Sequence, residues 1–330
     1  MQLWNPRLVP MFLWGLGISL LLFSSPCPAQ ENSATLEGEQ PSESAVDVYL
    51  LSGQSNMQGS GRVADLPASW LEPIESVRFW NGTDFEVLTP SVTRSAARVE
   101  QFGPEVGFAR EMAELAPERT IYLIKFFRSG QPLHHGWNGN QWAGPDPGPG
   151  RANFYPGLDA DDPNQGRHYR DMMTVAQAAW RHLEQQGLEP RLRGIVWMQG
   201  EQDSKHEQSA GEYAASLAQF KQRTEQDLHS DSVPFVFGQV LPHSPPLPRF
   251  THRDLIRAQQ QAVDMRSGAP ESTVGCWMVS TDGMPLLNDT VHYDARGQAM
   301  LGQAFALGML QAQGMLDAQA SQAESNPPNP

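Results

Sequence analysis

Three residues of the chain have the types that nucleophilic catalysis by a serine requires. Ser55 lies in the segment Gly53 to Met57, directly after an apolar run, and Asp289 and His292 lie three positions apart near the end of the chain. That spacing lets the carboxylate hold one imidazole nitrogen while the other nitrogen takes a proton from a serine. Each segment alone is also typical of a helix cap or a surface turn, so the prediction depends on both being present.

Two further segments carry groups that can stabilise a developing negative charge. Gln199 ends an apolar run and supplies an amide donor. Gly103 precedes Pro104, which suits the first turn of a helix, so a bare backbone N–H can approach a ligand there. The backbone N–H of Ser55 also lies at a predicted helix start, where negative charge is stabilised.

Glu201 and Asp203 allow other interpretations of the chemistry. Two carboxylates can cleave a glycosidic bond when they flank it, but their closeness at one strand end disfavours that geometry. Both can be simple loop acids, and Glu201 can also act as an auxiliary acid that orients His292. We favour Asp289 as the orienting acid because its three-residue spacing brings it to His292 directly.

The composition restricts the class of partner. The 330-residue chain has a formal net charge of −14 and is long enough to bury a full core. Such an acidic surface repels nucleic acid and anionic lipid, and it favours a neutral substrate or a small ligand. We therefore expect no nucleic-acid partner.

The start of the chain predicts a cleavable export signal over residues 1–30. Arg7 precedes an apolar run at 11–23, which is short for a membrane span, and a small residue follows at Ala29. Cleavage would give a secreted or periplasmic protein without stable membrane insertion. An uncleaved anchor is the alternative, and a lipid attached at Cys27 is a weaker one.

The remaining chain is expected to form one domain over residues 46–316. Residues 31–45 predict a linker and 317–330 a disordered tail. Removal of the signal leaves Cys276 as the only cysteine, so the core is expected to hold without a disulfide.

Short apolar runs alternate with helical patterns, which predicts a parallel sheet covered on both faces. Strands are expected at 46–51, 121–127, 192–198, 234–240 and 274–280, and helices at about 104–116, 169–186, 211–228, 251–266 and 295–313. Ser55 and Gln199 then lie at the carboxyl ends of strands, where open sheets form their ligand crevice.

Residues 129–166 interrupt this alternation, because they are rich in Gly, Pro and Asn. A loop of this length is usually functional or disordered. Trp137, Trp142 and Tyr155 offer flat apolar faces on which sugars can stack, or they anchor the loop to the body. A metal site at His134 and His135 lacks further ligands at suitable spacing, so we expect no metal.

Taken in order, four segments resemble the SGNH hydrolase superfamily. Within it they resemble the sialate O-acetylesterase and acetylxylan esterase group (carbohydrate esterase family 6). The resemblance extends from about residue 46 to residue 310. The segments are Gly53-Gln-Ser-Asn-Met57, Phe102-Gly-Pro-Glu105, Gln199-Gly-Glu201 and Asp289-Thr-Val-His292.

The resemblance implies a fold, an activity and a division of roles. It implies a three-layer α/β/α sandwich with a five-stranded parallel sheet, flavodoxin-like in style, with neither metal nor cofactor. It implies removal of O-acetyl groups from carbohydrate, of the acetylxylan or sialic acid type, by Ser55, His292 and Asp289. The N–H groups of Ser55 and Gly103 and the side chain of Gln199 would form the oxyanion hole.

The sequence differs from this group directly after the predicted strand at 121–127, where the group usually has a Gly-Gly-Thr turn. Arg128 stands there instead, and it can read a substrate carboxylate or form a structural salt bridge. The expected substrate contacts are Gln54, Arg128, Trp137 and Trp142. A non-catalytic carbohydrate-binding protein with the same fold is the alternative.

Overall fold

The structure is a computed structural model, and it describes residues 44–325. The predicted export signal and nearly all of the predicted linker lie outside the described residues. Among the described helices, none combines the length and the apolar character needed to cross a membrane.

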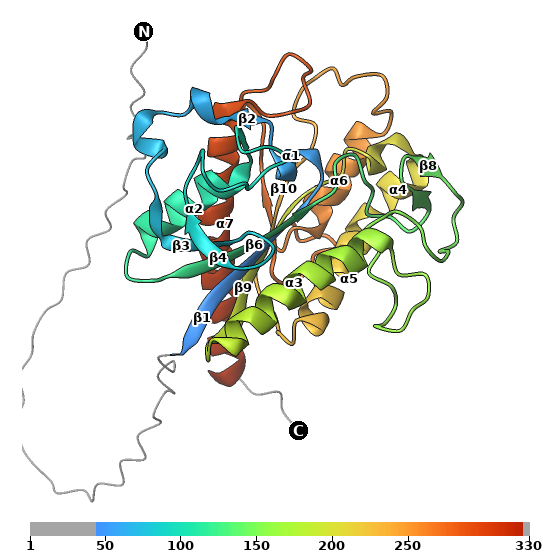
Figure 1. The fold of residues 1–330 in the computed structure, drawn as a ribbon. Helices are drawn as coiled ribbons and strands as arrows, with labels where there is room; N and C mark the ends of the chain where they lie inside the picture. Colours follow the sequence, from blue (N-terminus) through green and yellow to red (C-terminus); the bar gives the residue numbers. More distant parts are fainter. Residues whose placement is uncertain (1–43, 326–330) are drawn as a thin grey trace, which may run out of the picture. The chain divides into compact units, whose positions relative to one another are not determined.

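A seven-stranded sheet forms the centre of the fold, in the order β11-β10-β9-β1-β6-β3-β4 (Figure 1). Neighbouring strands are parallel except for β4, which is antiparallel to β3. The strands are β1 (Ala45–Gly53), β3 (Ile74–Trp80), β4 (Phe85–Leu88), β6 (Ile121–Phe127), β9 (Glu189–Met198), β10 (Phe235–Gly238) and β11 (Cys276–Val279). The central strand β1 is apolar on both faces because helices cover both sides of the sheet.

The sequence prediction of five strands was short by two, although its five strands and the fold class are confirmed. The missed strands β3 and β4 form a hairpin at one edge of the sheet, joined by the turn Asn81–Asp84. Asn81 Oδ1 accepts hydrogen bonds from the backbone N–H groups of Thr83 and Asp84, both at 3.0 Å. Half-exposed edge strands mix polar with apolar residues, so they lack the continuous apolar run that marks the buried strands.

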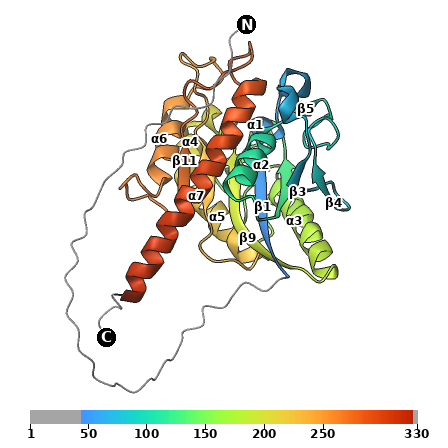
Figure 2. The same cartoon turned by 90° about the vertical axis from the view of Figure 1, so that its left-hand side faces the viewer.

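Helices pack on both faces, which gives the three layers (Figure 2). Helices α2 (Pro104–Leu115) and α7 (Ala295–Ser325) cover one face and contact each other closely. A Cβ at Gly302 of α7 would lie 2.0 Å from the Pro104 carbonyl oxygen, so only glycine allows this approach. Helices α3 (Arg167–Gln185) and α5 (Tyr213–Asp227) cover the other face, with α6 (Arg253–Val263) packed against α5.

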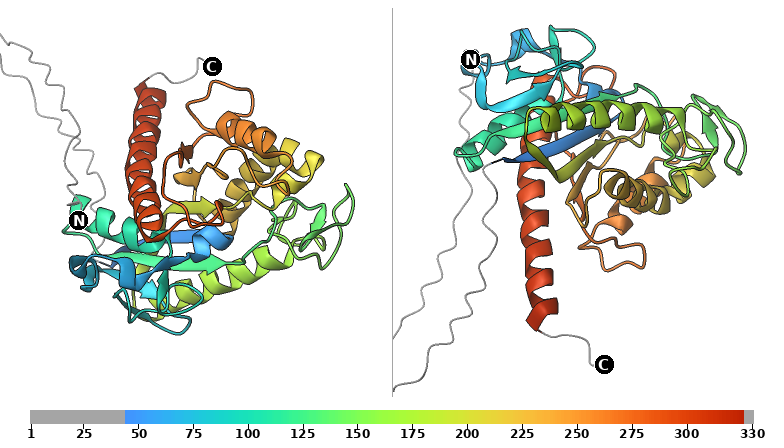
Figure 3. Two further views of the ribbon diagram at one scale, coloured as in Figure 1. Left: turned by 90° about the horizontal axis from the view of Figure 1, so that it is seen from above. Right: turned by 60° about the horizontal axis from the view of Figure 1, so that its bottom comes forward.

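One helix was missed and one predicted helix end was wrong. Helix α4 (Glu207–Gly211) was not predicted, while the expected helix at 211–228 corresponds to α5. Helix α7 continues to Ser325, so residues 317–325 are helical rather than part of a disordered tail. Figure 3 shows α7 as a single long rod beside the sheet.

Short elements occupy the connections. They are α1 (Ser55–Gln58), β2 (Gly61–Arg62), β5 (Gln101–Phe102), β7 (Trp137–Asn138), β8 (Gln141–Trp142) and the 3-10 turns η1 (Val63–Asp65), η2 (Ala68–Trp70) and η3 (Asp203–Lys205). Strands β7 and β8 belong to the long segment between β6 and α3, which lies next to α4 (Figures 1 and 3).

Candidate active site

The turn that carries Ser55 begins where β1 meets β9. Gly53 has φ +149°, and a Cβ at this position would lie 2.1 Å from the Met198 carbonyl oxygen. Only glycine lets the two strands approach so closely at their carboxyl ends. The Gln54 N–H then donates to the Met198 carbonyl oxygen at 2.9 Å, and Ser55 begins α1 with 8 % of its surface exposed.

Ser55, His292 and Asp289 lie together as the spacing predicted. The distance from Ser55 Oγ to His292 Nε2 is 3.0 Å, and that from His292 Nδ1 to Asp289 Oδ2 is 2.6 Å. These are hydrogen-bond lengths, so the chain of contacts runs from hydroxyl to imidazole to carboxylate.

A tight turn before α7 holds Asp289 against His292. Asp289 Oδ1 accepts the backbone N–H groups of Val291 and His292, both at 2.9 Å, while Thr290 between them has φ +60°. Partial burial raises the pKa of Asp289, but the hydrogen bonds from His292 and Val291 outweigh it, and the pKa lies below its ordinary value. The carboxylate therefore stays charged next to the imidazole.

Asn56 ties three segments of the site together, a role that the sequence analysis missed. Its Nδ2 donates to Glu201 Oε1 at 2.8 Å and to the Val291 carbonyl oxygen at 3.0 Å. Its Oδ1 accepts the Tyr293 N–H at 3.3 Å. The position of Asn56 directly after Ser55 could have indicated a role in the site. Its hydrogen-bond partners could not have been predicted, because they come from distant parts of the sequence.

Glu201 is a buried carboxylate in the wall of the same cavity as Ser55 and His292. Its Oε1 accepts from Asn56, while Oε2 has no hydrogen-bond partner within the described part of the chain. Burial raises the pKa of Glu201, although the Asn56 hydrogen bond and the nearby His292 act in the opposite direction.

Two predicted oxyanion donors are engaged elsewhere. The Gly103 N–H donates to Glu105 Oε1 at 2.8 Å. Gln199 Nε2 donates to Asp203 Oδ2 at 2.5 Å, with the Gln131 carbonyl oxygen at 3.1 Å, and Gln199 itself is fully buried. Neither donor is free in this structure to bind a further oxygen.

Three residues that line the cavity have backbone N–H groups without such partners. Ser129 and Gly130, in the turn after β6, line the same cavity as Ser55. The N–H groups of Ser55, Ser129 and Gly130 donate to no acceptor among the described residues. They are the available donors beside the serine hydroxyl.

A buried ion pair lies behind the nucleophile turn. Lys125 Nζ contacts Glu105 Oε2 and donates to the Ser95 carbonyl oxygen at 2.8 Å and the Gln58 carbonyl oxygen at 3.2 Å. Burial lowers the pKa of Lys125 and Glu105 opposes that change. Lys125 thereby holds the end of α1 through Gln58. The Glu105 carboxylate of the same pair accepts the Gly103 N–H.

Asp203 is occupied by four donors. Its Oδ1 accepts the His134 N–H at 3.0 Å and the Ser209 hydroxyl at 2.7 Å, and its Oδ2 accepts the Leu133 N–H at 2.9 Å and Gln199 Nε2 at 2.5 Å. A carboxylate so completely bonded cannot move a proton in a glycosidic reaction. It instead anchors the segment 129–166 to the end of β9.

The two tryptophans predicted to bind sugar contact α4 and the residue that precedes it. Trp137 is buried, and its Nε1 donates to the Ser209 hydroxyl at 2.9 Å. The Trp142 ring stacks on His206 with a centroid separation of 3.6 Å and an interplanar angle of 12°, and Gly136 lies against it. Both rings anchor the segment, Trp137 as a buried side chain and Trp142 through its stacking on His206.

The other predicted contacts differ in their placement. Gln54 lines the cavity beside Ser55. The Arg128 guanidinium lies 4.5 Å from the Phe126 ring centroid and pairs with Asp171 at 3.4 Å, which is the structural salt bridge that the sequence left open. Within residues 44–325, no group of three or more His, Cys, Asp or Glu side chains is arranged to hold a metal ion.

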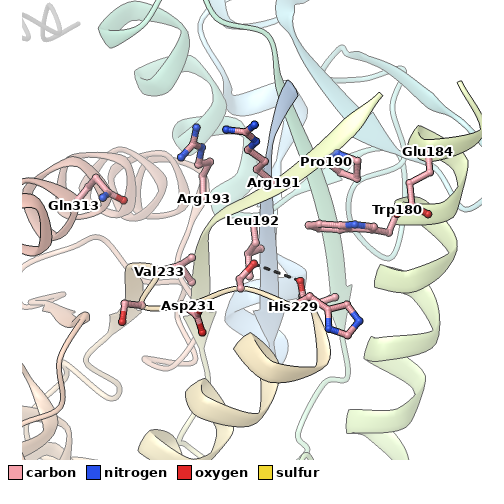
Figure 4. Close-up of a pocket in the computed structure, with 13 residues that line it drawn as sticks. Trp180, Glu184, Pro190, Arg191, Leu192, Arg193, His229, Asp231, Val233 and Gln313 are labelled. Atoms are coloured by element: carbon pink, nitrogen blue, oxygen red, sulfur yellow. Dashed lines mark hydrogen bonds between the residues drawn. The ribbon is translucent and has the colours of Figure 1, made fainter. Parts of the chain in front are cut away.

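The cavity at Ser55 measures about 250 Å³, and a larger one of about 410 Å³ lies at the start of β9. Trp180, Arg191, Arg193 and His229 help to line the larger cavity (Figure 4). It holds none of the residues that the motifs singled out, so we place the chemistry at the smaller cavity.

Comparisons with known proteins agree with this fold. A protein from Arabidopsis thaliana has a similar structure, with a TM-score of 0.58 and 18 % identity over 80 % of this chain and 98 % of that chain. NanS gives a TM-score of 0.56 and 16 % identity over 82 % and 98 %. A carbohydrate acetylesterase from Xanthomonas citri gives 0.54 and 18 % over 81 % and 57 %. No curated protein matches the sequence.

The family comparison reaches further than the fold. Residues 45–311 match the model of a family described as carbohydrate esterase, sialic acid-specific acetylesterase. This range includes all four segments on which the resemblance rests. The chain therefore belongs to this family of carbohydrate esterases and is a carboxylic ester hydrolase.

Proposed function

We propose that this protein is an exported serine esterase that removes O-acetyl groups from carbohydrate, with Ser55 as nucleophile, His292 as base and Asp289 as the orienting acid. The observation that carries the proposal is the continuous contact from Ser55 Oγ through His292 to Asp289, at 3.0 and 2.6 Å, in the wall of one cavity. Export is inferred from residues 1–30, as argued above.

The geometry suits a two-step acyl transfer. His292 Nε2 takes the proton of Ser55 Oγ, and Oγ attacks the acetyl carbonyl carbon. The bond from that carbon to the sugar oxygen breaks, and the sugar oxygen leaves with the proton from His292. A water molecule, deprotonated by His292, then attacks the acetyl carbon on Ser55. The bond from that carbon to Ser55 Oγ breaks, Oγ takes the proton back from His292, and acetate is released. Asp289 keeps the proton of His292 on Nδ1 and stabilises the imidazolium.

The oxyanion needs donors aimed at the cavity. The Ser55 N–H and the turn Ser129-Gly130 supply donors that have no present acceptor. Gly103 and Gln199 would first have to leave Glu105 and Asp203. We therefore assign the oxyanion to Ser55 and the turn after β6, in place of the two donors that the resemblance implied.

The substrate is an O-acetylated sugar, since the family is described as sialic acid-specific and a similar structure is a carbohydrate acetylesterase. Acetylated xylan, O-acetylated sialic acid and acetylated pectin-like glycans are the candidates that the sequence left open. A purely carbohydrate-binding role is not favoured, because the nucleophile, base and acid are all present and in contact.

Acetate release by the purified protein tests the proposal. The substrates are p-nitrophenyl acetate, O-acetylated sialic acid and acetylated xylan, each with Ser55→Ala beside Ser69→Ala, an exposed serine outside the cavity. Loss of the nucleophile should lower kcat by about 10³-fold or more. The Ser69 variant should keep full activity. Equal acetate release by the unmodified protein and Ser55→Ala would rule the serine mechanism out.

A further inference from the structure

Two cationic side chains line the cavity that contains Ser55, and the mechanism above uses neither. Lys205 lies in η3, directly after the loop that carries Glu201, and Arg249 lies in the loop between β10 and α6. Neither residue belongs to the four motifs of the sequence analysis. Both therefore need an explanation of their own.

The structure holds the two cations beside one aromatic ring. The Arg249 guanidinium lies 4.8 Å from the Phe250 ring centroid, and Lys205 Nζ lies 5.8 Å from the same centroid. The His252 N–H donates to the Ser204 carbonyl oxygen at 2.9 Å, which ties the loop of Arg249 to η3. The backbone contact joins the two segments, and the buried Phe250 lies beside both cationic side chains.

No carboxylate of the described residues forms an ion pair with either cation, although Glu201 lines the same cavity. Lys205 Nζ donates to the neutral Gln202 Oε1 at 2.7 Å, and no ion pair of the described chain includes Lys205 or Arg249. Burial and then the nearby Arg249 lower the pKa of Lys205, while the charge of Glu201 raises it. Like charges repel, and an anion that binds close to both cations offsets the repulsion between them.

The location of these charges is unusual for this protein. The chain carries a formal net charge of −14, whereas the wall of this cavity includes two cations without an ion-pair partner among the described residues. Such a local positive field draws an anionic ligand to the cavity and orients it there. An arginine and a lysine can both hydrogen-bond a carboxylate, and the planar arginine can do so with two parallel bonds.

We propose that Lys205 and Arg249 form the carboxylate-binding subsite of this cavity, which selects acetylated sugars that carry a carboxylate near the ester. The proposal rests on the esterase function stated above and adds the residues that decide between acidic and neutral sugars. Arg128, the carboxylate reader suggested by the sequence, is held by Asp171 and Phe126 outside this pair.

The test compares an acidic substrate with its own neutral form. O-acetylated sialic acid and O-acetylated galacturonic acid supply the same carboxylate on two different sugars, and the carboxyl methyl ester of each removes the charge. The measured quantity is the ratio of kcat/KM for acetate release from the acid to that from its methyl ester. We expect the ratio to exceed one for at least one of the two sugars in the unmodified protein.

Variants then assign the preference to its residues. Arg249→Gln and Lys205→Gln should each lower the ratio by about tenfold, the size expected when a hydrogen bond between charged groups is lost. Arg249→Lys should restore part of it. Arg181→Gln removes the same charge from an exposed site on α3 and should keep the ratio. Arg128→Gln should also keep it, because its guanidinium already has a carboxylate partner.

Binding measured without turnover separates this proposal from the esterase function. Calorimetry with free sialic acid, free galacturonic acid and their methyl esters should show tighter binding of an acid, weakened in the Arg249 and Lys205 variants. Equal binding of acid and methyl ester for both sugars overturns the subsite, whatever the outcome of the acetate assay. An acid preference that disappears in Arg128→Gln but persists in both other variants overturns it as well.

Discussion

Asp289 contacts His292 through both of its carboxylate oxygens, Oδ2 to the ring Nδ1 at 2.6 Å and Oδ1 to the backbone N–H at 2.9 Å. One oxygen therefore shapes the turn while the other fixes the imidazole. The two tasks can be separated by substitution, because an asparagine keeps one oxygen and replaces the other with a donor.

We expect Asp289→Asn to lower kcat by about 10³- to 10⁴-fold while the protein stays folded. The remaining oxygen still accepts the backbone N–H groups of Val291 and His292, but the amide N–H₂ favours the tautomer that carries its proton on Nε2. Steady-state kinetics and thermal melting measure the two effects. Asp161→Asn, at an exposed loop position, is the control. A kcat within tenfold of the unmodified value would show that another acid orients His292.

Glu201→Gln should make the protein more stable at neutral pH. The folded-state pKa of Glu201 is raised by burial, so between its unfolded and folded values the folded protein binds a proton that the unfolded chain has lost. Stability therefore falls as pH rises through this window and stays lower above it. The glutamine avoids that penalty and can still accept from Asn56.

The expected gain in Tm at neutral pH is about 2–4 °C, and it should vanish as the pH falls below the ordinary pKa of a glutamate. Melting curves from pH 4 to pH 8 measure it, with the exposed Glu207→Gln as control. A constant difference across this range would argue against a buried charge at Glu201.

Asp203→Asn should loosen the segment 129–166 from the end of β9. An amide in place of the carboxylate directs N–H groups at the donors of Leu133 and Gln199, so two charged hydrogen bonds are lost, at a cost of about 1.5–3 kcal/mol each. Hydrogen exchange of the peptide that contains Leu133 and His134 should accelerate, and urea unfolding should begin earlier. Asp146→Asn, exposed in the same segment, should change neither, and unaltered exchange in Asp203→Asn would remove its role as anchor.

Local patterns predicted the parts of the fold and site that depend on neighbouring residues. The buried strands were found because their apolar runs are continuous, and Asp289 and His292 because three residues of spacing determine their approach. The strand β3 and the edge strand β4 were missed because polar residues interrupt their apolar runs. The turn residues Asn81-Gly82 were the signal that could have revealed this hairpin.

The partners of individual donors could not be predicted in the same way. Gly103 and Gln199 have suitable groups, but Glu105 and Asp203 accept their hydrogen bonds, and only the folded chain shows which group faces which. The stacking of the Trp142 ring on His206 could not be predicted either, because the two residues come from separate segments of the chain. Lys205 and Arg249 belong to no motif, so the sequence did not indicate that both line the cavity.

Ser55 and His292 lie 237 positions apart, one near the beginning of the folded region and the other just before its last helix. During synthesis the nucleophile is therefore made early and its base almost last. A growing chain holds no assembled Ser-His pair until β1 and the turn before α7 have met. Any reaction that needs both side chains can therefore begin only after the whole domain has folded.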